Sequence, residues 1–353
     1  MSALRKFVIF LAFLVVAIPA VFAGVMYAKL KSIHVNQNSG MFAKHSYKYD
    51  NQIVNILLIG TDARPGETVS RSDSMMILTV DNKHKKLKLT SLGRDTYVDI
   101  PGHGYQKLTH AYAYGKEKLL AETIEQNFKL DLQNYAKVDF WSFIDILDAV
   151  GDIKVNLTWP EIKEMNKFIY ECYQWDNNPN KGPIKYVKWP GEQTLTGYQA
   201  LAFARIRHND STMKRDDRQR QVIEHILKKV EKMPVSSYPK LLNAILPHVK
   251  TNMTPGDILS LGMSVLELGD LHITTMQFPL HPEDEIRLPH AGYVIPFEPY
   301  ELKYLHEFIF DNKKPTKEDI EKATKEWYQK GSPSQYSNDP EYMSYIRAHG
   351  LNY

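Results

Sequence analysis

The chain is poor in cysteine and in the familiar catalytic signatures. Cys172 is the single cysteine among 353 residues, so no internal disulfide can form. This is compatible with a cytoplasmic protein, or with an exported bacterial protein that does not use disulfides. The sequence contains no HExxH, no paired CxxC, no GxSxG and no GxxxxGK[ST]. These absences argue against zinc peptidases, zinc ribbons, nucleophile-elbow hydrolases and P-loop nucleotidases.

The chain also lacks a strong excess of one charge. Its formal net charge is +3, which is too small to indicate nucleic-acid binding, and it carries no nucleic-acid-binding motif. We therefore expect no nucleic-acid partner.

One long apolar run stands at the N-terminus. Arg5 and Lys6 precede residues 7–27, which are uncharged and numerous enough to cross a bilayer as a helix. The two cations place the short N-terminal stub in the cytoplasm. Val21 and Ala23 could instead form a signal-peptidase site. Because the apolar run continues past that point, we expect an uncleaved single-pass anchor, with the rest of the chain outside the membrane.

The remainder alternates between strand and helix patterns. A polar linker at residues 31–50 precedes buried-type strands at 51–60, 74–81 and 86–93, and the last two are joined by a hairpin at 81–85. Expected helices follow at 116–128, 141–150, 197–204, 215–230, 239–246 and 255–268. Later strands are expected at 152–157 and 271–280, and an irregular stretch at 161–190. The pattern predicts an α/β (α+β) fold, a three-layer domain with a mixed central sheet and helices on both faces. We expect this domain to span residues 51–310 and a peripheral tail to follow at 311–353.

The hairpin places three charged residues together. Asp73 lies before the second strand, and Arg94 and Asp95 follow the third, so an antiparallel pair brings them to one edge of the sheet. Paired carboxylates, with Asp62 nearby in the sequence, suit Mg²⁺, which uses one or two carboxylates plus substrate phosphates. The alternative is that these aspartates only cap turns. Arg94 beside Asp95 favours a site for a metal-bound diphosphate.

A second basic segment lies at residues 200–223. Arg205 and Arg207 are two residues apart, so they would point to one side of an extended segment. Arg215 and Gln219 then share a face of the next helix, with Arg218 adjacent. Guanidinium groups bind phosphate oxygens two at a time. The segment therefore predicts a diphosphate pocket, although a surface helix with Arg–Asp pairs would show similar spacing.

Two further features are open to simpler interpretations. Lys107 and His110 precede a helix, and His110 could be a base or a hydrogen-bonded core histidine, of which the core role is the commoner. Val222, Ile223, Ile226 and Leu227 could line an apolar channel for a lipid, but ordinary core packing explains them as well.

Six blocks in this order resemble the LytR–CpsA–Psr family. They are LLIGTDAR at 57–64, RSDSMMILTV at 71–80, SLGRDTYVDIPG at 91–102, KLTHAYAYG at 107–115, LTGYQALAFARIR at 195–207 and RDDRQRQVI at 215–223. The resemblance spans about residues 51–230 through these motifs and extends to about 310, and a single-pass N-terminal anchor also fits the family.

The resemblance implies an enzyme on the outer face of the membrane of Gram-positive bacteria. Such proteins are similar in transferring teichoic acids or capsular polysaccharide from an undecaprenyl-diphosphate carrier to peptidoglycan, with formation of a phosphodiester. Carried over by position, Asp73 and Asp95 match the magnesium-associated acids. The positions that match diphosphate-contacting residues are Arg94, Arg205, Arg207, Arg215 and Gln219, with Arg218 in the same motif, and Lys107 matches a common basic position. We expect all seven to bind the diphosphate, and we expect Arg94, Asp95, Arg205 and Arg207 to be catalytic.

Two positions depart from the family pattern. Leu92 and Gly93 replace an Ile-Pro pair, which predicts a more flexible loop, and Thr212 stands where an acid is common. If that acid is a general base in relatives, Asp210 or Asp217 would have to replace it. Two alternatives to a transferase therefore remain: a hydrolase that splits lipid diphosphates with water, and a non-enzymatic, anchored, polymer-binding regulator.

Overall fold

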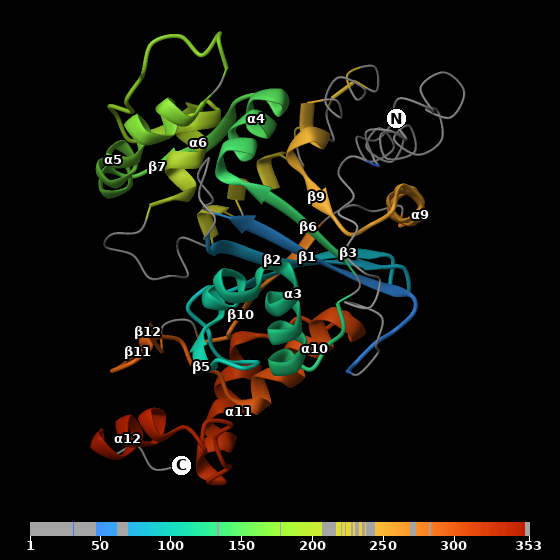
Figure 1. Ribbon diagram of the computed structural model, residues 1–353, viewed down its shortest axis with the longest axis vertical. Helices are drawn as coiled ribbons and strands as arrows, with labels where there is room; N and C mark the ends of the chain where they lie inside the picture. The colour runs from blue at the N-terminus through green and yellow to red at the C-terminus, as the bar shows by residue number, and fades with distance from the viewer. Residues whose placement is uncertain are drawn as a thin grey trace. The chain divides into compact units, whose positions relative to one another are not determined.

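The computed structural model contains all 353 residues and describes residues 31, 47–61, 70–132, 134–176, 178–206, 217–219, 221–222, 224–226, 229, 233–234, 237, 244–268, 273–281 and 284–349 (Figure 1). The chain divides into two compact units. Unit 1 comprises Met1–Asn38, Leu58–Thr68 and Asn134–His272, and unit 2 comprises Ser39–Leu57, Val69–Gln133 and Ile273–Tyr353.

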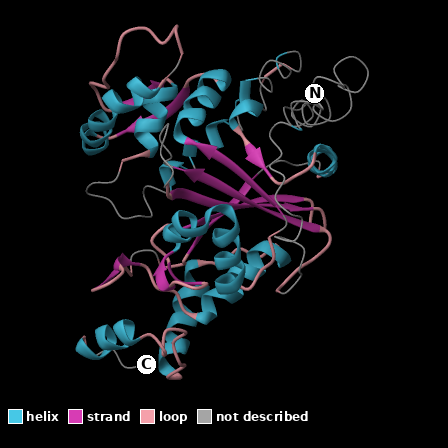
Figure 2. Cartoon of the chain, in the orientation of Figure 1, coloured by secondary structure: helices cyan, strands magenta, loops and turns pink. Residues whose placement is uncertain are grey.

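The largest sheet has six strands in the order β10-β3-β2-β1-β6-β9. Its strands, drawn in magenta in Figure 2, are β1 (Ile53–Thr61), β2 (Ser72–Asp81), β3 (Lys86–Leu92), β6 (Asn134–Asp139), β9 (Lys250–Thr251) and β10 (Ile273–Phe278). Since β10 runs parallel to β3 whereas β2 and β3 are antiparallel, the sheet is mixed. The predicted mixed α/β fold with a central mixed sheet is therefore confirmed.

The predicted hairpin is also confirmed. β2 pairs with β3 in a register that joins Met75 to Leu92 and Asp81 to Lys86. Both strands are almost continuously buried, as expected of strands covered on both faces. Asp81 accepts hydrogen bonds from the backbone N–H of His84 and from Lys88 Nζ, both across the turn.

Besides its strands of the large sheet, the described part of unit 2 contains two short strand pairs and four helices. The pairs are β4 (Tyr97–Ile100) with β5 (Gly104–Lys107) and β11 (Ile286–Leu288) with β12 (Gly292–Val294). The helices are α3 (Leu108–Phe128), α10 (Pro299–Asp311), α11 (Lys317–Gln329) and α12 (Pro340–Ala348). α3 is kinked at Gly115 and Lys116, which have non-helical backbone angles, so the predicted helix at 116–128 forms only the second part of a longer element.

The C-terminal stretch holds its own packed cluster. Tyr336 and Tyr342 are buried with Tyr97, and Tyr97 Oη donates to Asp339 Oδ2 at 2.5 Å. The Tyr336 hydroxyl donates to the carbonyl of Tyr97 at 2.8 Å. Residues after 311, which the sequence pattern presents as a peripheral tail, therefore contribute buried side chains to unit 2.

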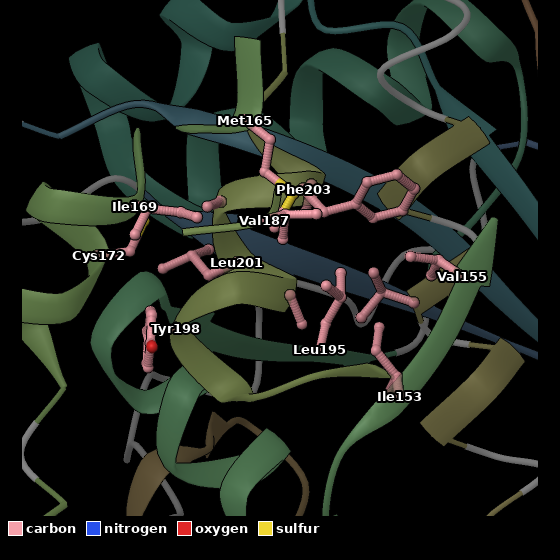
Figure 3. Close-up of a cluster of buried hydrophobic side chains, with 14 of the residues drawn as sticks. Ile153, Val155, Met165, Ile169, Cys172, Val187, Leu195, Tyr198, Leu201 and Phe203 are labelled. Carbon is pink, nitrogen blue, oxygen red and sulfur yellow. The ribbon is translucent and has the colours of Figure 1, made fainter. Parts of the chain in front are cut away.

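Unit 1 surrounds a second core, shown in Figure 3. Its elements are α4 (Phe140–Val150), β7 (Ile153–Leu157), α5 (Trp159–Trp175), β8 (Gly191–Leu195), α6 (Gly197–Ala204), η3 (Leu246–His248) and α9 (Pro255–Glu267). β7 and β8 pair antiparallel. The core gathers apolar side chains from α4, β7, α5, β8 and α6, with Val222 at 0% exposure.

Helix α5 corrects the expectation of an irregular stretch at 161–190. Thr158 and Glu161 form a capping box, and a proline stands in the first turn, where its missing N–H has no cost. Ile162, Met165 and Ile169 then fall on one buried face at helical spacing. The aromatic residues, Pro and Asn of the segment obscured this periodicity in the sequence.

No helix among the described residues is both long enough and apolar enough to cross a membrane. The anchor predicted at residues 7–27 lies outside the described part of the chain, as do most of the helix predicted at 239–246 and residues 32–46 of the linker.

Candidate active site

Asp73 and Arg94 face each other because of the β2–β3 register. Met75 pairs with Leu92, and Asp73 and Arg94 each lie two residues beyond this pair, at the same end of the hairpin. Arg94 Nη1 donates to Asp73 Oδ1, and its Nε lies 3.3 Å from Asp95 Oδ2. The predicted meeting of these three side chains at the end of the hairpin is observed.

Lys107 completes the cluster from β5. Its Nζ lies 3.0 Å from Asp95 Oδ1. Two carboxylates, one guanidinium and one ammonium thus share a site of zero formal charge, and we call Asp73, Arg94, Asp95 and Lys107 the charged cluster. Both aspartates are largely buried, at 4% and 7% exposure. Burial by itself lowers the pKa of Arg94, but the neighbouring carboxylates of Asp73 and Asp95 outweigh it and raise that pKa.

Thr109 ties the cluster to its scaffold, and sequence reasoning missed it. Its backbone N–H donates to the carbonyl of Arg94 at 3.0 Å, and its hydroxyl donates to the carbonyl of Ser72 at 2.8 Å. One residue at the start of α3 therefore holds both strand ends. Its only sequence signal is its place two residues after Lys107 in the KLTH block.

Gly93 is tightly enclosed, contrary to the flexible loop expected from the missing Ile-Pro pair. Its N–H donates to the carbonyl of Phe278, and its carbonyl accepts from Thr96 Oγ1 at 2.6 Å. A Cβ at this position would lie 3.1 Å from Thr96 Oγ1 and 3.4 Å from Pro279 Cδ. A larger residue here would require the Thr96 side chain to shift by a few tenths of an ångström.

His110 has the structural features of a hydrogen-bonded histidine. Its Nδ1 lies 2.9 Å from Gln106 Oε1. Burial lowers its pKa, and the nearby cations Arg71 and Lys107 lower it further.

Glu285, just before β11, is a carboxylate that the sequence pattern did not single out. Its pKa is raised, first by desolvation and then by the charge of Asp95.

The described part of the arginine segment belongs to unit 1. Arg205 follows α6, and its Nη1 lies 2.9 Å from Glu171 Oε2. Its guanidinium lies over the rings of Phe168 and Trp175, 5.0 and 4.6 Å from their centroids. The Arg205 guanidinium is thus held by two aromatic rings and one carboxylate of α5.

Arg218 contacts the opposite end of the same helix. Its Nη2 and Nε both lie 3.1 Å from Glu161 Oε1, and the residue is 4% exposed. Glu161 and Glu171 are ten positions apart, or roughly 15 Å along a helix.

The other predicted residues of this segment are described only in part. Gln219 is partly buried, and Arg207 and Arg215 lie outside the described residues, as do Asp62, Asp210 and Thr212. Val222 is buried in the unit 1 core with Ile226 packed against it, which agrees with ordinary packing at these two positions.

The charged cluster offers a cation two carboxylates. No group of three or more His, Cys, Asp or Glu side chains suited to a metal occurs within the described ranges. Asp73 and Asp95 supply the oxygen donors that Mg²⁺ prefers, and both lie within reach of one guanidinium, so they are close together. These two carboxylates fit a magnesium ion.

Comparison with known proteins identifies the family. The model of the LytR_cpsA_psr family matches residues 23–295. The chain belongs to this family. It is 32% identical over 263 residues to the polyisoprenyl-teichoic acid–peptidoglycan teichoic acid transferase TagT of Bacillus subtilis (strain 168), a match that covers 71% of this chain and 78% of the relative. It is 38% identical over 205 residues to the transferase of the same description, TagU, of Bacillus mycoides (strain KBAB4), covering 57% of this chain and 60% of TagU.

A solved structure extends the match to the fold. The structure described as TagT bound to LI-WTA superposes with a TM-score of 0.60 at 26% identity, covering 79% of this chain and 99% of that chain. The charged cluster lies within the region that the LytR_cpsA_psr model matches, whereas α10, α11 and α12 lie beyond it.

Proposed function

We propose that this chain transfers a teichoic-acid-type glycopolymer from a polyprenyl-diphosphate carrier to peptidoglycan. The charged cluster carries the proposal. It gathers a fixed guanidinium, an ammonium and two buried carboxylates at the end of a β-hairpin, in a chain whose family relatives are named as such transferases.

The reaction exchanges the phosphoanhydride bond of the carrier diphosphate for a phosphoester bond. A peptidoglycan hydroxyl oxygen attacks the phosphorus nearest the polymer, and the bond from that phosphorus to the bridging oxygen breaks. The products are a phosphodiester and polyprenyl monophosphate, and the proton that the hydroxyl loses passes to the leaving phosphate. Arg94 and Lys107 would bind the diphosphate oxygens and stabilise the charge that grows in the transition state. We infer the same diphosphate-binding role for Arg205, Arg207, Arg215, Arg218 and Gln219, as the family resemblance implies, with Arg205, Arg207 and Asp95 also in catalytic roles.

Asp73 and Asp95 would hold magnesium when the substrate is bound. The ion would supply positive charge beside the leaving phosphate. Without substrate, Arg94 and Lys107 already balance the two aspartates. A diphosphate adds negative charge to the cluster, and that charge lets it accept a divalent cation.

We also infer the finer architecture that the family implies. Residues 7–27 would anchor the chain in the cell membrane, with the catalytic domain outside and helices covering both faces of the sheet. An external catalytic domain would meet both a membrane-borne carrier and the wall.

A reconstituted reaction tests the function. The purified full chain is supplied with lipid-linked teichoic acid, with and without peptidoglycan, in Mg²⁺ or in EDTA. We expect polymer joined to peptidoglycan through a phosphodiester, and loss of this product in EDTA. Free phosphorylated polymer as the main product would identify a hydrolase instead. Tight binding of the lipid-linked polymer without turnover would identify a regulator.

A further inference from the structure

A pocket lies between α10 and α11, outside the residues that the family model matches. The two helices lie in the orange to red C-terminal region of Figure 1. The volume of the pocket is about 480 Å³, which suits a small molecule. Its wall combines three aromatic rings with three ammonium groups, contributed by Tyr300, Tyr304, Trp327, Lys303, Lys322 and Lys330. Asp319 and Glu326 add two carboxylates to the same wall.

The aromatic part of the wall is fixed in place. The rings of Tyr300 and Trp327 lie 5.6 Å apart at an interplanar angle of 42°. The Tyr300 hydroxyl lies 2.9 Å from Thr324 Oγ1, and the Tyr304 hydroxyl donates to the carbonyl of Asp319 at 3.0 Å. Since both hydroxyls are engaged, the two tyrosines offer a bound molecule mainly their ring surfaces.

Trp327 supplies a donor for a ligand. Its Nε1 is buried, and none of the described residues provides it with an acceptor. Buried polar groups are nearly always hydrogen-bonded, so a buried indole N–H in a pocket wall is suited to an oxygen atom brought by a ligand.

The three ammonium groups of the wall outnumber its two carboxylates, so the lining carries a formal charge of +1, and both carboxylates already have partners. Asp319 uses its carboxylate to accept from the backbone N–H and hydroxyl of Thr316 at the start of α11. Lys303 lies 3.9 Å from Glu307, and Lys330 lies 3.9 Å from Glu326, in pairs whose lysines are strongly exposed. Such pairs contribute little stability, so both ammonium groups can turn to a phosphate at small cost.

Helix α11 has few buried contacts of its own, so a bound ligand would stabilise it. None of its 13 residues is buried. A helix with so little apolar burial docks weakly, and a molecule held between it and α10 would add contacts to both.

We propose that this pocket binds a sugar unit that carries a phosphate group. Ring surfaces of Tyr300 and Trp327 would cover the apolar face of the sugar, Trp327 Nε1–H would donate to a sugar oxygen, and the lysines would bind the phosphate. The inference deepens the proposed function, on which it rests for the source of the ligand: a phosphate-bearing glycan is the class of polymer transferred, and the pocket would hold a repeat unit of it.

Binding to the full chain in detergent micelles tests the pocket without turnover. The probes are N-acetylglucosamine 1-phosphate, N-acetylglucosamine and inorganic phosphate, each titrated separately by calorimetry. We expect the sugar phosphate to bind at least about tenfold more tightly than either component, because ring surface, N–H donor and lysines act together. Equal binding of sugar phosphate and inorganic phosphate, or no binding of the sugar phosphate, would overturn the proposal.

Matched variants locate the binding. Trp327→Phe removes the N–H and keeps a ring, and Lys322→Ala removes one cation. Each should weaken sugar-phosphate binding about fivefold, roughly the effect of one hydrogen bond. Lys317→Ala, an exposed lysine of α11 outside the pocket, is the control and should bind normally. Hydrogen exchange of the α11 amides provides a second readout and should slow when the sugar phosphate binds. Unchanged affinity in both pocket variants, with unchanged exchange, would refute the assignment.

Two further experiments identify the source of the ligand and distinguish failure of the pocket proposal from failure of the proposed function. Soluble teichoic-acid fragments should compete with the sugar phosphate, whereas phosphate-free muropeptides should not, and the reverse would overturn the proposal. The Arg94→Ala chain should bind the sugar phosphate as the parent chain does. Failure of transfer by the parent chain, with its pocket binding intact, would then count against the proposed reaction alone.

Discussion

At the scale of single residues, Arg94 is the side chain on which the charged cluster depends. Its guanidinium contacts both Asp73 and Asp95, and those carboxylates are buried. A preorganised donor of this kind stabilises charge without rearranging during the reaction.

Arg94→Ala should therefore lower kcat for transfer by a factor on the order of 100 or more. The measurement is formation of polymer–peptidoglycan product by purified full-length protein, with circular dichroism to show that the fold is kept. Arg287→Ala is a matched control, because Arg287 is exposed on β11 and lies over the ring of Tyr293. Near-normal turnover of Arg94→Ala would remove the cluster from the mechanism.

Arg205 differs because it already has structural partners. Its guanidinium lies over two rings and forms an ion pair with Glu171. Arg205→Ala should lower the free energy of unfolding by about 1–2 kcal/mol through loss of these contacts. It should also reduce transfer if the residue binds diphosphate as proposed.

Glu171→Gln separates these two roles of Arg205. It weakens the ion pair but leaves the guanidinium in place, so transfer should persist while some stability is lost. Urea denaturation and the transfer assay measure the two effects. A fully stable Arg205→Ala protein would contradict the structural role.

At the scale of elements, the β2–β3 hairpin holds an ion pair in its interior. Lys88 and Asp81 are both fully buried, with Nζ 2.5 Å from Oδ2, and Lys88 Nζ also donates to the carbonyl of Ile309 in α10. A buried charge without its partner is costly.

Lys88→Met should lower the free energy of unfolding by about 3–5 kcal/mol, because it leaves Asp81 buried without its main counter-ion. Urea denaturation of the purified protein measures the loss. The double variant Asp81→Asn with Lys88→Met should recover much of it, since both charges are then removed. Equal stability of the single and double variants would show that the ion pair is not what holds this hairpin.

The elements also show which predictions could be made from sequence. Asp73 and Arg94 could be paired in advance because hairpin register is a local property, set by a short turn and two apolar strands. The capping box of α5 was readable too, but its helix was missed because surface aromatic residues masked the buried face. The contact between Tyr97 and Asp339 joins residues 242 positions apart, and no local rule relates them.

At the scale of the whole molecule, burial of carboxylates makes stability depend on pH. Glu301 is 2% exposed and accepts from the backbone N–H groups of Leu280 and Glu298. Burial raises its pKa to about 8, although those two hydrogen bonds lower it. The folded state therefore favours the protonated acid.

The folded state binds the proton of Glu301 more tightly than the unfolded state does. The resulting stabilisation is fully present below the pKa of the unfolded state, about 4.5, and is lost as the pH rises toward 8, the pKa in the folded state. We expect the parent protein to lose about 4–5 kcal/mol across this range through Glu301, since each pKa unit corresponds to about 1.4 kcal/mol. Glu301→Gln cannot ionise and should show a flatter profile, even though it loses one acceptor. Thermal unfolding from pH 5 to pH 8 measures the slope, and Glu318→Gln, on exposed α11, is the control. Parallel profiles of Glu301→Gln and the parent would exclude Glu301 as the cause.

The sequence by itself determined the family, the mixed α/β fold, the hairpin and the meeting of Asp73, Arg94 and Asp95. Each depends on motifs or on periodicities and turns that act over a few residues. The tertiary structure alone decided that Thr109 joins both strand ends, that α5 holds Arg205 and Arg218 at its two ends, and that α10 and α11 enclose a pocket. These features depend on side chains brought together by packing across long stretches of chain, and local sequence does not encode that packing in readable form.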